Sequence, residues 1–130
     1  MIVKDLLQLR TELSKILTEE LPIHVKFRLS RLQKSVEEQS AIVFENRNKI
    51  IFDLEPSGHI PATDKDGNPN EKLNQFNEMY GKILEEDVNI GEIPKVFISD
   101  ITNFNTGNNY PMLFELVFYD IEKEPALTTQ

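Results

Sequence analysis

Oxygen-bearing side chains recur at alternate positions in one short run, residues 64 to 70, and this spacing is the most suggestive of chemistry in the sequence. Such alternation opens the calcium loop of an EF-hand, where carboxylate and amide oxygens are the ligands. The sixth position of that loop falls on Pro69, where the sharp turn needs glycine, and the twelfth falls on Gln75, which has no bidentate carboxylate. We therefore interpret the run as a turn before a helix and predict no metal site there.

Histidine, cysteine and the usual catalytic motifs provide no second candidate. The sequence has two histidines, His24 and His59, and no cysteine. We expect the histidines to lie at opposite ends of one long helix, where they cannot share a metal ion. The sequence also lacks a nucleophile elbow, a glycine loop that cradles phosphate, and a zinc-binding helix motif. It therefore predicts no enzyme activity, no cofactor and no small-molecule substrate.

Three basic side chains, Arg28, Arg31 and Lys34, lie within reach of one face of that long helix. Cations grouped in this way can meet phosphates or an acidic protein partner, so they are candidate interaction residues. The alternative is that they pair with the nearby Glu19, Glu20, Glu37 and Glu38 or simply solvate the helix.

The net charge of -8 is concentrated in the second part of the chain. Residues 1–54 hold nine Lys or Arg against eight Asp or Glu, whereas residues 55–130 hold five against fourteen. An acidic second half repels nucleic acid and membrane surfaces, so neither is an expected partner. No stretch approaches the roughly 18 apolar residues of a membrane span, and we expect a soluble protein that is synthesised in the cytoplasm.

The first two elements that position these residues are helices. Residues 2–21 place their apolar side chains at the three-and-four spacing of an amphipathic helix. Pro22 removes a backbone donor and disfavours helical geometry before it, so the chain should break there and restart. A second helix over residues 23–54 would then form a helical hairpin with the first.

The second helix carries a heptad-like row of apolar residues, namely Val25, Leu29, Leu32, Val36, Val43 and Ile50. Polar Gln39 and Asn46 occupy the two missing positions of the row, and both are candidate contact residues. A helix of this size is roughly 45 Å long at 1.5 Å per residue, so part of it should project or pack against another chain. The alternative is that the first and third helices of the same chain cover its whole length.

Residues 55–68 form a turn-rich insert in which Asp66-Gly67 favours a tight hairpin turn. His59 and Ile60 lie in this insert and complete the set of candidate contact residues. Asn68 offers a helix cap before Pro69, which predicts a third helix over about residues 69–85. Its apolar stripe, the natural partner of the long helix, consists of Leu73, Phe76, Tyr80, Ile83 and Leu84.

The end of the chain is mixed in character. Residues 88–90 and 95–98 resemble short strands, which would pair with the Ile60 region or with a neighbouring chain's edge. Residues 103–109 read as a loop, and the apolar run 111–119 favours a short helix because Pro111 suits a first turn. The expected fold is mainly α (α+β), one helix-rich domain over residues 1–121 with a polar tail over 122–130.

Several short motifs resemble a family of uncharacterised short proteins of tailed bacteriophages. They are Glu20-Leu21-Pro22-Ile23, Phe27-Arg28-Leu29, the run from Phe44 to Ile51, Asp66-Gly67-Asn68, Phe76-Asn77-Glu78 and the run from Glu85 to Ile90. The resemblance spans roughly residues 6 to 101. It implies two helices, a turn-rich insert, a third helix and a β-like end, whereas the family's apolar C-terminal helix is only loosely matched by residues 111–119.

In a bacteriophage context we favour a virion-associated structural or assembly protein, which contacts other phage structural proteins or copies of itself, because a long helix and adaptable loops suit repeated chain-to-chain contact. Such a protein would pass from the host cytoplasm into the virion. The alternative is a small host-takeover or anti-defence protein that masks a host protein. An architectural nucleic-acid binder is the third hypothesis.

Overall fold

The computed structural model describes residues 1–101 and 110–119. This part of the chain contains the helices α1 (Val3–Ile16), α2 (Ile23–Leu54), α3 (Glu71–Leu84) and α4 (Pro111–Leu116). It also contains the short 3-10 helix η1 (Ile98–Ile101) and the strands β1 (Val96–Phe97) and β2 (Phe118–Tyr119), which pair in parallel. The prediction of a mainly helical fold with a small β element is confirmed.

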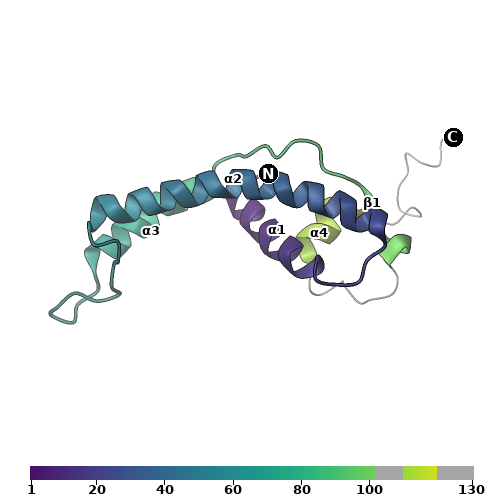
Figure 1. Cartoon of the computed structure of the whole chain (residues 1–130). Helices are drawn as coiled ribbons and strands as arrows, with labels where there is room; N and C mark the ends of the chain where they lie inside the picture. The colour runs from purple at the N-terminus through teal and green to yellow at the C-terminus, as the bar shows by residue number, and fades with distance from the viewer. Residues whose placement is uncertain (102–109, 120–130) are drawn as a thin grey trace.

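Helix α2 is the axis of the molecule, and its bounds are those expected from the sequence. Figure 1 shows α1 and α4 beside one half of α2 and α3 beside the other half. We call the first region the head, which comprises α1, α4, η1, both strands and residues 23–36 of α2. The stalk comprises residues 40–54 of α2 with α3, and residues 55–70 form the tip loop.

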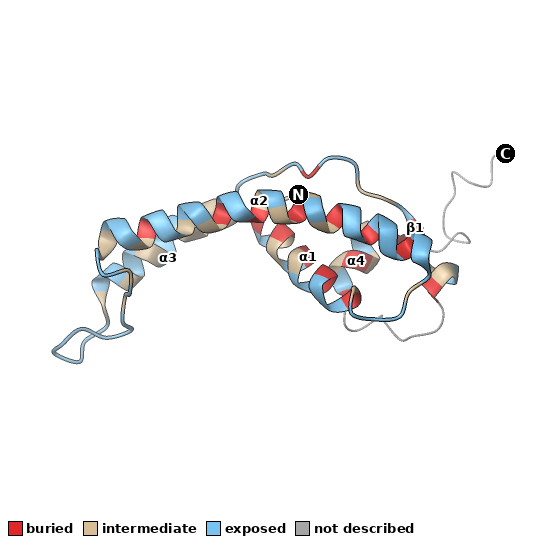
Figure 2. Cartoon of the chain, viewed as in Figure 1, coloured by how far each residue is buried: buried red, intermediate tan, exposed pale blue. Residues whose placement is uncertain are grey.

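The hydrophobic core lies in the head. Leu6, Leu9, Leu13 and Ile16 of α1 are fully buried against Val25, Leu29 and Val36 of α2, and the strands and α4 close the far side with Val96, Leu113 and Val117. Figure 2 shows the buried residues concentrated where α1, α4 and α2 meet. Full burial of such a side chain contributes about 1.5–3 kcal/mol, so this cluster dominates the stability of the fold.

The first helix is shorter than predicted: it ends at Ile16, whereas the sequence predicts an end near residue 21. The Thr18 hydroxyl donates to the Lys15 carbonyl at 2.6 Å, and the Thr18 and Glu19 amides bond three residues back. These bonds tighten the last turn and use the carbonyls that a longer helix would need. The chain is therefore already out of helix when it reaches Pro22.

The first helix does not form a long hairpin with α2, since α1 crosses only the head half obliquely (Figure 1). The stalk half of α2 packs instead against α3. The alternative reading, in which the first and third helices together line the long one, describes this arrangement better.

From the sequence, Gln39 and Asn46 were predicted to lie in the row of α2 residues that packs against other helices. This prediction is wrong for both residues. Ser40 is fully buried, whereas Gln39 is half-buried and Asn46 is exposed. At about 100° per residue, Gln39 and Ser40 lie equally near the line through Val36 and Val43, so the position of the packing helices decides between them. Asn46 turns its amide back to the Ile42 carbonyl at 2.8 Å.

The third helix begins two residues later than predicted. Asn70, not Asn68, is its cap, and its side chain accepts the Lys72 amide at 3.0 Å. Pro69 instead forms an antiparallel bridge with Thr63, across the Asp66-Gly67 turn that the sequence predicted. The turn is confirmed, but its flanks form one isolated bridge and no strands.

Residues 88–90 are not a strand. The chain after α3 runs extended back along α2 to the head, and on the way it passes the N-terminus, where Val88 donates to the Met1 carbonyl at 2.9 Å. The strand expected at 95–98 is present at Val96–Phe97, but it pairs with β2 and not with the Ile60 region. Residues 111–116 form the expected short helix, while the end of the same apolar run supplies β2.

A buried carboxylate fastens α4 to α1. Glu12 is 4% exposed, and its two oxygens accept the backbone amides of Leu113 at 2.9 Å and Met112 at 3.1 Å. Because Pro111 has no amide hydrogen, these are the first free donors of α4, and a carboxylate suits the positive end of the helix. Gln8 donates to the same carboxylate at 3.0 Å.

The predicted loop at 103–109 and the tail at 122–130 lie outside the described residues. In the part of the chain that the structure describes, no helix combines the length and apolar character needed to cross a membrane.

Replacing Glu12 by Gln should destabilise the head. The Gln amide group would place a donor against a backbone donor and leave one of the α4 amides unpaired, which we expect to lower the free energy of unfolding by about 1–3 kcal/mol. The measurement is urea unfolding followed by circular dichroism. Glu38→Gln, at an exposed position of α2, is the matched control and should cost less than about 0.5 kcal/mol. Equal losses for the two variants would show that the Glu12 contact is not stabilising.

Candidate functional site

The stalk has no fully packed core and exposes three large apolar side chains, while the head exposes two, Ile23 at 86% and Phe27 at 61%. The expected stripe of α3 faces α2, yet no side chain of α3 is fully buried. Ile42 is 53% exposed, Phe52 55% and Met79 44%. Two helices alone cannot enclose a core, so these side chains stay in contact with water in the isolated chain.

A groove of about 290 Å³ lies where the stalk meets the tip loop. Its lining comes from both helices and from the loop, and comprises Arg47, Asn48, Ile51, Gly58, His59, Ile60, Leu73 and Phe76. The Phe76 ring stacks on Tyr80 with 5.4 Å between ring centres, and the Arg47 guanidinium lies 5.8 Å from the centre of the Phe76 ring. Arginine and aromatic rings held together in a hollow are typical of protein contact sites.

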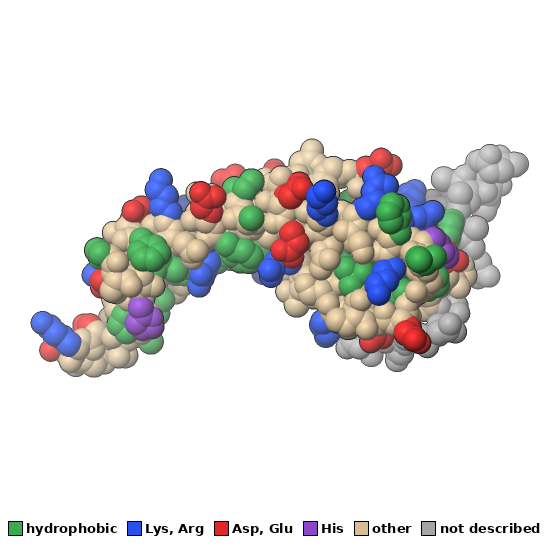
Figure 3. Space-filling view, viewed as in Figure 1, with side chains coloured by type: hydrophobic (Ala, Val, Ile, Leu, Met, Phe, Trp, Pro, Cys, Tyr) green, Lys and Arg blue, Asp and Glu red, His purple; other side chains and the backbone are tan. Residues whose placement is uncertain are grey.

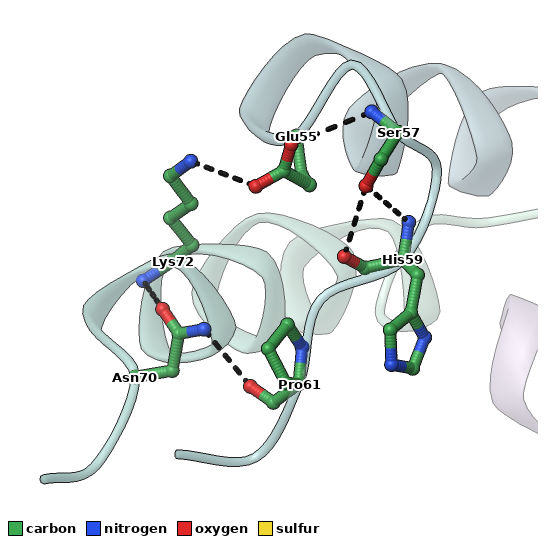
Figure 4. Close-up of polar contacts among 6 residues, drawn as sticks. All are labelled: Glu55, Ser57, His59, Pro61, Asn70 and Lys72. Carbon is green, nitrogen blue, oxygen red and sulfur yellow. Dashed lines mark hydrogen bonds and ion pairs between the residues drawn. The ribbon is translucent and has the colours of Figure 1, made fainter. Parts of the chain in front are cut away.

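Polar contacts fix the tip loop against α3, as Figure 4 shows. Glu55 accepts the Lys72 ammonium at 3.0 Å, and the Asn70 side chain donates to the Pro61 carbonyl at 2.9 Å. The hydrogen bond from Lys72 lowers the pKa of the Glu55 carboxyl below its ordinary value, and the backbone amide of Ser57 lowers it further. The loop is therefore tied to both helices of the stalk.

His59 and Ile60, two of the residues singled out in the sequence, are thus brought together in the stalk groove. The backbone of His59 bonds the Ser57 hydroxyl, while its imidazole turns away from these contacts (Figure 4). His24 lies at the other end of α2, as expected. Among the described residues, no three His, Cys, Asp or Glu side chains lie close enough together to hold a metal ion.

A second hollow of about 300 Å³, which we call the basic cleft, lies on the head between α2 and the extended chain before β1. It is lined by Arg28, Arg31, Leu32, Ser35, Glu92, Pro94 and Lys95. The structure therefore brings Arg28 and Arg31 together, as the sequence suggested, but leaves Lys34 exposed outside the cleft. Figure 3 shows Lys and Arg side chains gathered over this half of α2.

The cations of the basic cleft are held in place by uncharged groups. Arg28 donates to the Lys95 carbonyl at 3.0 Å, and the Arg31 guanidinium lies 5.7 Å from the centre of the Phe27 ring. Of the alternative partners considered for these cations, Glu37 pairs instead with Arg10 of α1 at 3.0 Å. Arginine pairs with carboxylates and phosphates through two parallel donors, which is the chemistry this cleft offers.

Gln39 and Asn46 join neither hollow. Sequence reasoning missed Arg47 and Phe76, which build the stalk groove, and Lys95 and Glu92, which complete the basic cleft. For Arg47 a signal existed, since it stands four residues after Val43 and three before Ile50 on the packed face of α2. Lys95 had none, because only the return of the chain along α2 brings it to Arg28.

Gly58 should be the least replaceable residue of the tip loop. Its φ is +81°, and an added Cβ would lie 2.7 Å from Cε1 of Phe52. Gly67 is the matched control, because it has a φ of +82° and open space around it. We expect Gly67→Ala to cost about 1–2 kcal/mol through backbone strain alone and Gly58→Ala to cost more, measured by thermal unfolding. Equal costs would contradict this expectation and would show that the half-exposed Phe52 ring moves aside.

Glu55 should titrate at a lower pH than an ordinary glutamate, whose value is 4.5. Its folded-state pKa is depressed, so its contribution to stability is present above the unfolded value and is lost as the pH falls through the folded one. Carboxyl carbon shifts in an NMR titration would measure this directly. Lys72→Gln should move the Glu55 pKa back toward 4.5, whereas Lys82→Gln, elsewhere on α3, should leave it unchanged. A Glu55 pKa insensitive to Lys72→Gln would rule out that pair.

Comparisons of the chain with protein-family models, with curated proteins and with solved structures found no match.

Proposed function

We propose that this chain is a non-enzymatic protein that works by packing against other protein chains, and that its stalk is the contact surface. The observation that carries the proposal is the incomplete packing of the stalk. Helix α3 has no fully buried side chain. Ile42 and Phe52 are about half exposed, and Met79 is 44% exposed. A further chain laid on these faces would remove apolar surface that the chain cannot cover itself.

A second copy of the same chain is the partner that the charges of the stalk favour. Glu45 and Lys49 alternate on the exposed side of α2, and Glu78 and Lys82 do so on α3. One stalk therefore offers both signs of charge to another, so two copies can pair opposite charges across a self-complementary two-fold contact. A strongly acidic stalk would instead repel its own copies.

The biological setting we propose is the assembled particle of a tailed bacteriophage, with the chain as a virion-associated structural or assembly component. Support comes from the resemblance of residues 6 to 101 to short phage proteins and from the elongated form of the molecule, in which the stalk stands clear of the head (Figure 3). A contact surface held away from a compact core suits chains that pack in repeated arrays.

Self-association should depend on the stalk. We expect the wild-type chain to form dimers or larger species as its concentration rises, measured by light scattering after size exclusion. Ile42→Ser with Met79→Ser should weaken association about tenfold to a hundredfold, since each change removes apolar surface from the contact. Ile23→Ser with Phe27→Ser is the matched control, because it removes two exposed apolar side chains from the head. A wild-type chain that stays monomeric throughout would overturn the second-copy contact.

Mass spectrometry of purified phage particles tests the setting separately. The chain should be found in them, or in assembly intermediates, at a fixed ratio to the major structural proteins. Its absence from both would sink the virion reading and favour the alternative of a host-takeover or anti-defence protein.

A further inference from the structure

We infer that the basic cleft is a binding site for a phosphate monoester dianion. The inference is independent of the stalk and of the proposed assembly function. It rests on the charge, the positioning and the lining of the cleft.

Within residues 1–101 and 110–119, the cleft carries more positive than negative charge. Three cations line it, Arg28, Arg31 and Lys95, against the single carboxylate of Glu92, which leaves a balance of two positive charges. None of these three cations belongs to an ion pair within the part of the chain that the structure describes. A phosphate monoester, with about -1.5 to -2 charges at pH 7, would balance the cleft, whereas one carboxylate or diester would not.

The cations are also positioned before any ligand arrives. Arg28 is tied to the Lys95 carbonyl at 3.0 Å, Arg31 lies over the Phe27 ring, and the Lys95 ammonium lies 5.6 Å from the centre of the Tyr119 ring. Side chains already restrained in this way lose little conformational entropy when a ligand binds. Carbonyl and aromatic partners restrain the cations and leave their charge available to an anion.

The lining accommodates more than the phosphate. The volume of about 300 Å³ matches the lower end of small-molecule sites. Ser35 adds a hydroxyl donor, and Leu32 and Pro94 provide an apolar wall for the organic part of an ester. A nucleic acid is disfavoured, because its many phosphates would meet the acidic remainder of the chain.

Titration calorimetry with inorganic phosphate and with phenyl phosphate tests the site. We expect saturable binding of both at one site per chain. Phenyl phosphate should bind more tightly than inorganic phosphate, and equal or weaker binding would overturn the monoester as the ligand. Absence of saturable binding of either probe would overturn the inference.

Variants distinguish a built site from general charge attraction. Arg31→Gln and Lys95→Gln should each weaken phosphate binding about tenfold or more, since each removes a charged donor, while Glu92→Gln should tighten it. Lys34→Gln is the matched control, because it removes the same charge from the same helix outside the cleft, and it should change binding less than about twofold. A loss from Lys34→Gln as large as that from Arg31→Gln would overturn the site, provided circular dichroism shows every variant folded.

Discussion

A mismatch of lengths governs the whole structure: α2 has 32 residues, whereas α1 and α3 have 14 each. A single short helix leaves half of the long one uncovered, so the chain uses two, one at each end of α2. Only the head receives a third layer, from α4 and the two strands. Most of the buried apolar side chains therefore lie in the head. The stalk remains a pair of helices. Its apolar faces stay partly exposed to solvent, because no other element of the described chain covers them.

The third layer of the head depends on one buried polar contact. A carboxylate inside a core is costly unless its oxygens are hydrogen-bonded, and Glu12 meets this need with the amides of Met112 and Leu113. The same bonds satisfy the start of a helix of six residues, which is too short to be stable by itself. β1 then aligns with β2 because α4 has placed Val117 beside Val96. Glu12 of α1 thus helps to hold the end of the described chain against the head, together with buried Leu113 and Val117.

Local signals in the sequence were enough to place α2, α3 and α4 approximately, because apolar spacing and proline positions act over a few residues. They failed where two local choices were nearly equal, as between Gln39 and Ser40, or where the partner was distant, as for β1 with β2. The candidate sites divide in the same way. Arg28 and Arg31 are three residues apart on one helix and could be grouped from sequence, whereas Lys95 reaches them only through the return of the chain along α2. Nothing local marked Glu12 as a cap for residues about a hundred positions away.

The basic cleft and the stalk groove lie on regions that differ in packing. The head has a buried core, whereas the stalk is a pair of helices with partly exposed apolar faces. The head is packed without help, so the basic cleft can accept or release an anion while the core around it stays unchanged. The stalk is incompletely packed, so a second chain that binds to it would also stabilise it. The fraction of stalks bound by a second chain would therefore be linked to the stability of α3. Since α2 is continuous through both regions, it holds the two surfaces at opposite ends of one rigid axis (Figure 1). The two hollows share no lining residue, so substitutions can test each of them separately in the same molecule.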